Sequence, residues 1–271
     1  MKEYTYGNKA VTVFFAITII LSAAAETLIA IAKWEWMYAV LMWLPALAAA
    51  IAVCVSFKES GKTFSIRALT SSLGFRRCKF RYILLGCLLP LIYLLVPYAI
   101  FWLIRPGSLV THGISLFSLL FTLVIGIFIS LLSAIGEEIG WRGFMVPALY
   151  ERVGLEKTLL ISGLFWCCWH LPLLIFGDYM SGTPLWYQIP AFILCIFPVG
   201  VMAGILTVRT GSVWPAAFLH AAHNDYDQMI FGVLTVADDK MFFVSETGVL
   251  TILCAWALAI LMYCREKKRA G

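Results

Sequence analysis

Eight long apolar segments dominate this sequence of 271 residues. Backbone N–H and C=O groups find no water in lipid, so segments that cross a bilayer must satisfy these groups internally, as helices. The chain is 62% hydrophobic and 13% charged, with a mean hydropathy of +0.92, whereas about a quarter of the residues in a soluble domain are charged. The sequence therefore predicts an all-α, polytopic transmembrane bundle of about eight helices, near 10–32, 36–55, 82–104, 114–136, 157–176, 186–206, 212–233 and 247–264.

Lysine and arginine residues divide unequally between the two ends of these spans. If the N-terminus is cytoplasmic, seventeen lie on that side, and only Lys33, Arg105 and Lys240 lie on the other. Because positive residues accumulate on the cytoplasmic side, we expect an integral protein of the cell membrane with both termini in the cytoplasm. The polar loop 58–81 is then placed to contact anionic lipid. We expect no nucleic-acid partner, since the basic residues do not alternate with stacking aromatics.

The chain divides into three predicted parts of one membrane domain. These are N-terminal helices with the basic loop at 1–113, a core carrying the chemistry at 114–233, and a last helix with a basic tail at 234–271. The alanines at 23–25 resemble a signal-peptide cleavage site, but apolar residues continue through Ile31, which favours a retained helix. None of the eight cysteines forms a CxxC pair and most lie in spans, so we expect no disulfide framework.

Ionisable and strongly polar side chains gather inside the predicted spans between 133 and 227. A charged group at the bilayer centre costs roughly 3 kcal/mol, which is a large share of a fold stability of about 5–15 kcal/mol. Such groups must therefore pair or face a wet cavity. The candidates for a functional site are Glu137, Glu138, Arg142, His170, His220, His223, Asn224, Asp225 and Asp227.

The stretch GEEIGWR at 136–142 places two adjacent carboxylates at the end of an apolar run. Residues i and i+4 share a helix face, so Glu138 can pair with Arg142. Glu137 lies about 100° around the helix from Glu138 and is less compensated, which suits a general base. The alternative is a cluster of charges at the membrane interface with no catalytic role.

Two further stretches place histidines inside apolar helices. In LFWCCWHLP at 164–172, His170 has almost no local partner, so we expect it to find one across the bundle. In WPAAFLHAAHND at 214–225, His220 and Asn224 stand at i, i+4 and can donate two hydrogen bonds to one developing oxyanion. The alternatives are a satisfied core histidine and interhelical hydrogen bonds without catalysis.

The depths of these groups in the membrane decide whether they can meet. Helical rise places His220 roughly 12 Å and His170 roughly 18–20 Å from the cytoplasmic ends of their helices. Glu137 lies near the membrane surface if its helix is straight. A tilted or early-starting helix would bring Glu137 to the depth of His170.

Together the three stretches resemble the CAAX prenyl protease and bacteriocin-processing family of intramembrane glutamate proteases, also called the abortive-infection family. Its motifs are EExxxR, FxxxH and HxxxN, and the first and third match 137–142 and 220–224. The second departs from the pattern, because Trp166 stands four residues before His170 where the family has phenylalanine. The likeness covers about 120–230.

The resemblance implies a peptide-bond hydrolase with no cofactor and no metal. It implies cleavage near the C-terminus of a membrane-associated or lipidated protein, which in eukaryotic members is a prenylated CAAX protein. The resemblance also assigns roles to six residues. Glu137 and His170 would activate a water molecule, and His220 and Asn224 would bind the oxyanion. Glu138 and Arg142 would form a supporting ion pair.

Two other functions stay open from the sequence. A zinc peptidase could use Glu137, His170, His220 and His223 as ligands, although no HExxH motif is present. A non-catalytic immunity or scaffold protein, or a carrier, could also use intramembrane His and Glu, although no paired broken helices indicate a transporter. Catalysis needs Glu137, whereas a scaffold should survive its replacement by glutamine.

Overall fold

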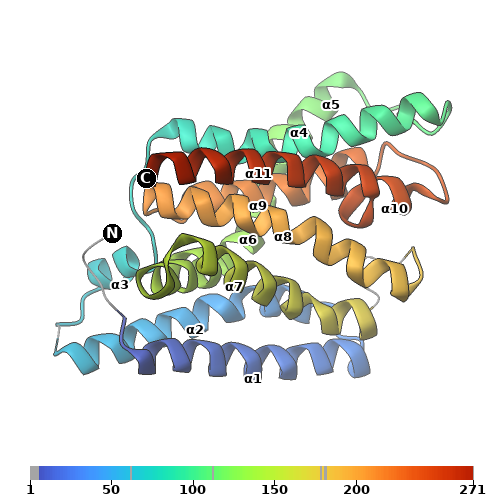
Figure 1. Ribbon diagram of the computed structural model, residues 1–271. Coiled ribbons are helices and arrows are strands. Elements are labelled where there is room, and N and C mark those ends of the chain that lie inside the picture. Colours follow the sequence, from blue (N-terminus) through green and yellow to red (C-terminus); the bar gives the residue numbers. More distant parts are fainter. Residues whose placement is uncertain (1–5, 62, 112, 178, 180–181, 271) are drawn as a thin grey trace.

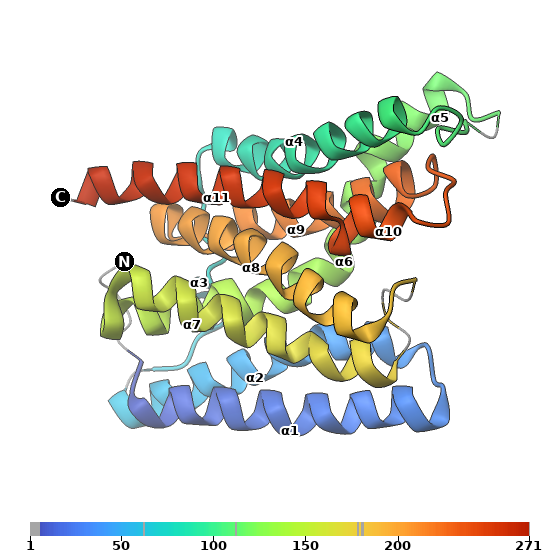
Figure 2. The ribbon, with the colours of Figure 1, turned by 45° about the vertical axis from the view of Figure 1, so that its right-hand side comes forward.

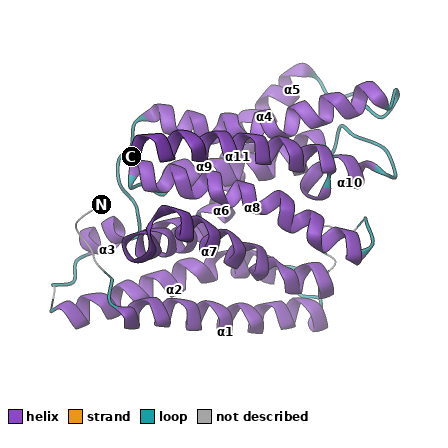
Figure 3. Cartoon of the chain, in the orientation of Figure 1, coloured by secondary structure: helices purple, strands orange, loops and turns teal. Residues whose placement is uncertain are grey.

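The computed structural model is helical throughout the part of the chain that it describes, which is residues 6–61, 63–111, 113–177, 179 and 182–270 (Figures 1 and 3). No strand element occurs within these residues. Three elements, η1, η2 and η3, are π-helical and continue directly from α-helices, while η4 is a short 3-10 turn. The elements are α1 (Asn8–Ala32), α2 (Met37–Ser60), α3 (Ile66–Ser72), α4 (Phe80–Ile104), α5 (Leu116–Phe121), η1 (Thr122–Gly126), α6 (Ile127–Glu138), η2 (Ile139–Met145), α7 (Val146–Phe176), α8 (Leu185–Thr210), α9 (Trp214–Asn224), η3 (Asp225–Phe231), α10 (Lys240–Phe243), η4 (Ser245–Thr247) and α11 (Val249–Ala270).

Every predicted span corresponds to helical structure, and the predicted fold class is confirmed. Six helical stretches of the described chain are long and apolar enough to cross a membrane. One of them, Leu116–Phe176, contains two predicted spans, because α5 to α7 follow one another without a loop and the helical backbone is broken only at Gly154. The predicted span 212–233 is α9 with η3, a shorter and more polar helix. The protein is therefore an integral membrane protein built as an all-α bundle.

The long helices run antiparallel, so α1 begins and α11 ends on the same side of the bundle (Figures 1 and 2). We call this side the basic end, because α3 and the basic C-terminal residues of α11 also lie there. Lys33 and Arg105 follow the far ends of α1 and α4, at the opposite side. Lys2 and Lys62, two of the predicted cytoplasmic residues, lie outside the described chain. The cytoplasmic orientation of the basic end stays a prediction.

The chain reverses direction at Gly154, inside the segment named α7. Gly154 has φ 73° and ψ −179°, a conformation that glycine adopts without steric cost. Rings on the two sides of this reversal pack together, since the Trp141 centroid lies 5.7 Å from Phe165 and 5.6 Å from Trp169. Glu137 and His170 lie almost equally far along the chain from Gly154. The depth gap expected from a helix ending near 136 is therefore absent, because that helix continues well past Glu137 before it turns.

Close approach to the α2 backbone fixes the position of the helical turn that carries Glu137 and Glu138. A Cβ atom on Gly136 would lie 2.6 Å from the Met42 carbonyl oxygen, and one on Gly140 would lie 2.7 Å from the Pro45 carbonyl carbon. Both positions therefore require glycine where α6 and η2 press against α2. Small residues of this kind allow membrane helices to approach closely and gain van der Waals contact.

Replacing Gly140 with alanine should destabilise the fold by about 1–3 kcal/mol, because the new methyl group overlaps rigid backbone of α2. Thermal unfolding in detergent measures the effect. Gly204→Ala is the matched control, since its Cβ would meet only the flexible tip of Leu159. Equal unfolding temperatures for the two variants would contradict the packing described here.

Candidate active site

Glu137 is the last residue but one of α6, and its side chain is only 2% exposed. Its Oε2 atom accepts hydrogen bonds from the indole Nε1 of Trp141, at 3.1 Å, and of Trp166, at 2.9 Å. Both donors bind the same oxygen, which leaves Oε1 as the atom free to take a proton. Glu137 thus lies on a different face from its neighbour, as the helical spacing predicted.

Glu138 is fully buried and forms the ion pair that its spacing predicted. Its Oε1 atom lies 2.6 Å from Nη1 of Arg142, whose guanidinium stacks over the Trp166 ring at 4.3 Å. The same Oε1 lies 3.0 Å from Nδ1 of His220 on α9. Glu138 therefore links the charged pair to the third motif, a contact that sequence spacing did not indicate.

The contact with Glu138 determines which ring nitrogen of His220 can donate a hydrogen bond to a substrate. A carboxylate can only accept a hydrogen bond, so Nδ1 of His220 carries a hydrogen when the two pair. Donation from Nε2 to an oxyanion then requires the doubly protonated ring. The adjacent Glu138 carboxylate favours that charged form by Coulomb attraction.

His170 finds its nearest polar partner within its own helix. Its Nδ1 atom lies 2.8 Å from the Trp166 carbonyl oxygen, so Nδ1 is the donor and Nε2 of the neutral ring is an acceptor. The expectation that His170 would have to find its partner across the bundle was wrong in this respect, because the carbonyl one turn earlier supplies it. The ring also packs on Trp169, Tyr179 and Phe192.

The structure brings the predicted residues of the three motifs into one buried cluster. Glu137, His170 and His220 all contact the Trp166 side chain, whose Nε1 donates to Glu137 at 2.9 Å. The Trp166 ring lies 5.6 Å from His170 and 5.4 Å from His220, between centroids. Asn224 is half-buried and follows His220 by one turn on α9.

Comparison with known proteins agrees with this arrangement. Residues 118–225, which contain all three motifs, match the family described as type II CAAX prenyl endopeptidase Rce1-like. Through this segment the chain is similar to that family. The resemblance expected from the motifs is thereby confirmed.

The chain is also similar to a curated relative named CAAX prenyl protease 2, from Methanococcus maripaludis. The two are 30% identical over 145 residues, which is 52% of this chain and 50% of the relative. The chain therefore spans about half the length of the relative that it matches.

A second buried polar cluster lies on another face of α9. His223 places Nδ1 2.9 Å from the Tyr93 hydroxyl and Nε2 3.2 Å from Oε1 of Glu246. Asp227 accepts hydrogen bonds from the hydroxyls of Tyr98, at 2.9 Å, and Ser245, at 2.6 Å. The sequence reading missed Glu246, whose only signal was an isolated acid just before the last apolar segment.

The zinc alternative requires its candidate ligands to converge. Within the described chain, no three His, Cys, Asp or Glu side chains form a group suited to a metal ion. His220 turns to Glu138, while His223 turns to Tyr93 and Glu246. These residues do not fit a zinc site, and no step of the chemistry below is routed through a metal.

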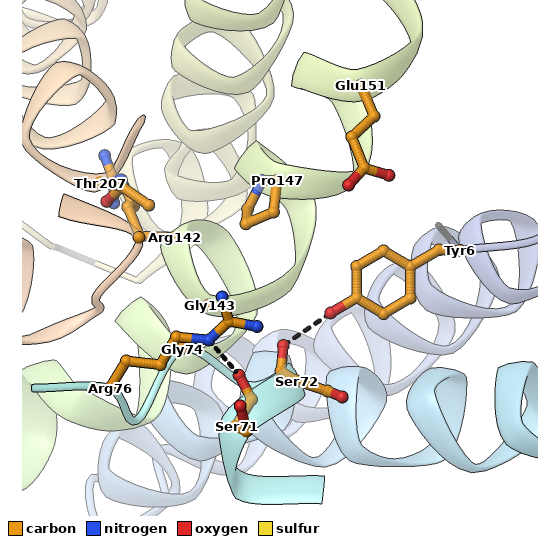
Figure 4. A pocket seen from close by; sticks show the side chains of 11 residues that line it. Tyr6, Ser71, Ser72, Gly74, Arg76, Arg142, Gly143, Pro147, Glu151 and Thr207 are labelled. Carbon is orange, nitrogen blue, oxygen red and sulfur yellow. Dashed lines mark hydrogen bonds between the residues drawn. The ribbon is translucent and has the colours of Figure 1, made fainter. Parts of the chain in front are cut away.

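A small cleft is lined by Arg142 and by residues of several other helices (Figure 4). Arg142 and Thr207 lie across it from Tyr6 and Glu151, and the Arg76 guanidinium reaches toward its centre. Its volume is about 30 Å³, and a water molecule needs roughly 10–15 Å³ by this measure. The cleft thus has room for water beside the buried ion pair.

Proposed function

We propose that this protein is an intramembrane glutamate endopeptidase that hydrolyses a peptide bond in a membrane-associated, CAAX-type lipidated protein or peptide. The observation that carries the proposal is the buried Glu137 carboxylate, which has one oxygen held by two indoles, one of which also packs against His170 and His220. A fixed, weakly compensated carboxylate of this kind is suited to take a proton from water.

The proposed reaction uses Glu137 as base and then as acid, His170 to hold the water, and His220 and Asn224 to bind the oxyanion. Oε1 of Glu137 takes a proton from a water molecule that is also held by His170, and the hydroxide adds to the scissile carbonyl carbon. His220 and Asn224 donate hydrogen bonds to the developing oxyanion, where preorganised donors stabilise charge at little reorganisation cost. Glu137 then returns the proton to the leaving amine, and the C–N bond breaks.

In this proposal the Glu138–Arg142 pair keeps His220 doubly protonated, which lets its Nε2 donate to the oxyanion. Glu138 accepts from Nδ1 of His220 and from Arg142, so the imidazolium and guanidinium share one buried carboxylate. We propose the cell membrane as the location, with the basic end facing the cytoplasm. The name of the relative from Methanococcus maripaludis supports a prenylated substrate.

Hydrolysis of two matched reporter peptides tests the proposal. Both carry a C-terminal CAAX sequence, and one has a prenyl group on the cysteine. Purified protein in lipid nanodiscs should cleave the prenylated peptide, with product masses that sum to the substrate plus one water. Intact peptides in the presence of folded protein would favour a non-catalytic scaffold, immunity protein or carrier.

Metal removal separates this mechanism from a zinc peptidase. Because the candidate ligands do not converge, we expect a tight chelator to leave the rate of hydrolysis unchanged. The measurement is the initial rate before and after dialysis against the chelator. Loss of activity that returns on adding zinc would contradict the proposed mechanism.

A further inference from the structure

Trp166 is the side chain around which the polar cluster is assembled. Its indole N–H donates to Glu137 at 2.9 Å, and its ring carries the Arg142 guanidinium at 4.3 Å. The His170 and His220 rings form T-shaped contacts with the same ring, and the backbone carbonyl of Trp166 accepts from His170. No part of the reaction proposed above uses Trp166 as a reacting group.

The indole N–H of Trp166 provides a hydrogen-bond donor, which packing of an aromatic ring alone does not. A phenyl ring at this position could stack on Arg142 and meet both histidines, but it has no donor for Glu137. The terminal torsion of a buried carboxylate is broad when nothing restrains it. Two donors on one oxygen fix the plane of the Glu137 carboxylate between Trp141 and Trp166, so its other oxygen is held in one place.

We infer that Trp166 is a positioning residue, whose indole N–H holds Oε2 of Glu137 so that Oε1 is the oxygen that activates water. This inference rests on the proposed function and names the device that orients its base. Trp141 shares the task from one turn along the same helix run as Glu137. Trp166 reaches Glu137 from the other arm of the reversal at Gly154, so it also fixes the base relative to His170.

The neighbouring Trp169 provides a matched control on the same helix. It is buried, and its ring centroid lies 5.0 Å from His170, closer than the ring of Trp166. Its indole N–H donates to the Ser22 hydroxyl at 2.8 Å and not to Glu137. Trp169→Phe therefore removes an indole donor and the same ring volume without touching the proposed base.

Steady-state kinetics with the prenylated reporter test the inference. Hydrogen bonds to charged groups are among the stronger ones, so Trp166→Phe should lower kcat about 10- to 100-fold. KM should stay within about threefold, because the lost contact orients the base and does not bind substrate. Trp169→Phe should keep kcat within about twofold. Equal kcat values for wild type and Trp166→Phe would overturn the inference.

A measurement without substrate tests the contact itself. The protein has ten tryptophans, and ¹⁵N labelling gives each indole N–H a signal that its Trp→Phe variant assigns. Glu137→Gln should shift the Trp141 and Trp166 signals and leave the Trp169 signal in place. An unmoved Trp166 signal would overturn the inference even if the wild type is active. A wild type that cleaves nothing while the Trp166 signal shifts would instead overturn the proposed function and leave the contact standing.

Discussion

Replacing Glu137 with glutamine should lower kcat for the reporter about 1,000-fold and leave the fold intact. A general base contributes about 10²- to 10⁴-fold to rate, and the amide of glutamine cannot take the proton from water. The amide oxygen can still accept from Trp141 and Trp166, so the buried contacts of Glu137 survive. Initial rates and thermal unfolding, measured on the same preparation, separate the two effects.

Glu26→Gln is the matched control for this variant. Glu26 is another buried glutamate, in α1 and 8% exposed, with its Oε1 atom lacking a hydrogen-bond partner among the described residues. The same chemical change away from the cluster should keep kcat within about twofold. A Glu137→Gln variant as active as Glu26→Gln would contradict the role of Glu137 and favour a protein that does not use this carboxylate in catalysis.

Replacing Arg142 with alanine should destabilise the protein by about 3–5 kcal/mol, because removing one partner of a buried ion pair leaves the other charge uncompensated. Arg142 is only 2% exposed, and it also stacks on Trp166. Activity should fall with stability, since Glu138 then has only His220 as a partner and the Trp166 ring loses its contact with the guanidinium. The unfolding temperature in detergent measures the first effect.

Arg105→Ala is the control for the ion-pair argument. Arg105 pairs with Asp239 at the opposite end of the bundle, with side chains 51% and 42% exposed. Exposed pairs contribute about 0–1 kcal/mol, so this variant should unfold close to the wild-type temperature. If Arg142→Ala and Arg105→Ala unfold at the same temperature, the Glu138–Arg142 pair does not stabilise the fold.

The sequence predicted what depends on short-range geometry. Apolar length located all eight helical segments, and the i, i+4 spacing of Glu138 and Arg142 identified a pair that lies 2.6 Å apart. The same geometry separated Glu137 from that pair. These features follow from helical periodicity, which a sequence carries directly.

The depth of Glu137 could not be predicted in the same way. Hydropathy ends the fourth span near 136, because the polar residues after it interrupt the apolar run. In the structure the helix continues through the π-helical η2, and the chain turns only at Gly154. The glycines that pack this stretch against α2 act through tertiary contact, which one sequence does not display.

The contacts between distant residues were equally hidden. Glu138 meets His220 across α6 and α9, and Trp166 meets Glu137 across the turn at Gly154. In a sequence, tryptophan among apolar residues indicates packing, and nothing marks which indole N–H will find a carboxylate. The replacement of phenylalanine by Trp166 in the second motif was the only sequence signal of that donor.

Cleavage of the prenylated reporter in H₂¹⁸O under single-turnover conditions tests the central claim most directly. If Glu137 activates water for attack on the peptide bond, the wild type should form a product whose new carboxylate carries one ¹⁸O atom, and Glu137→Gln should leave the reporter intact over the same time. Labelled product formed at the same rate by both proteins would contradict the account.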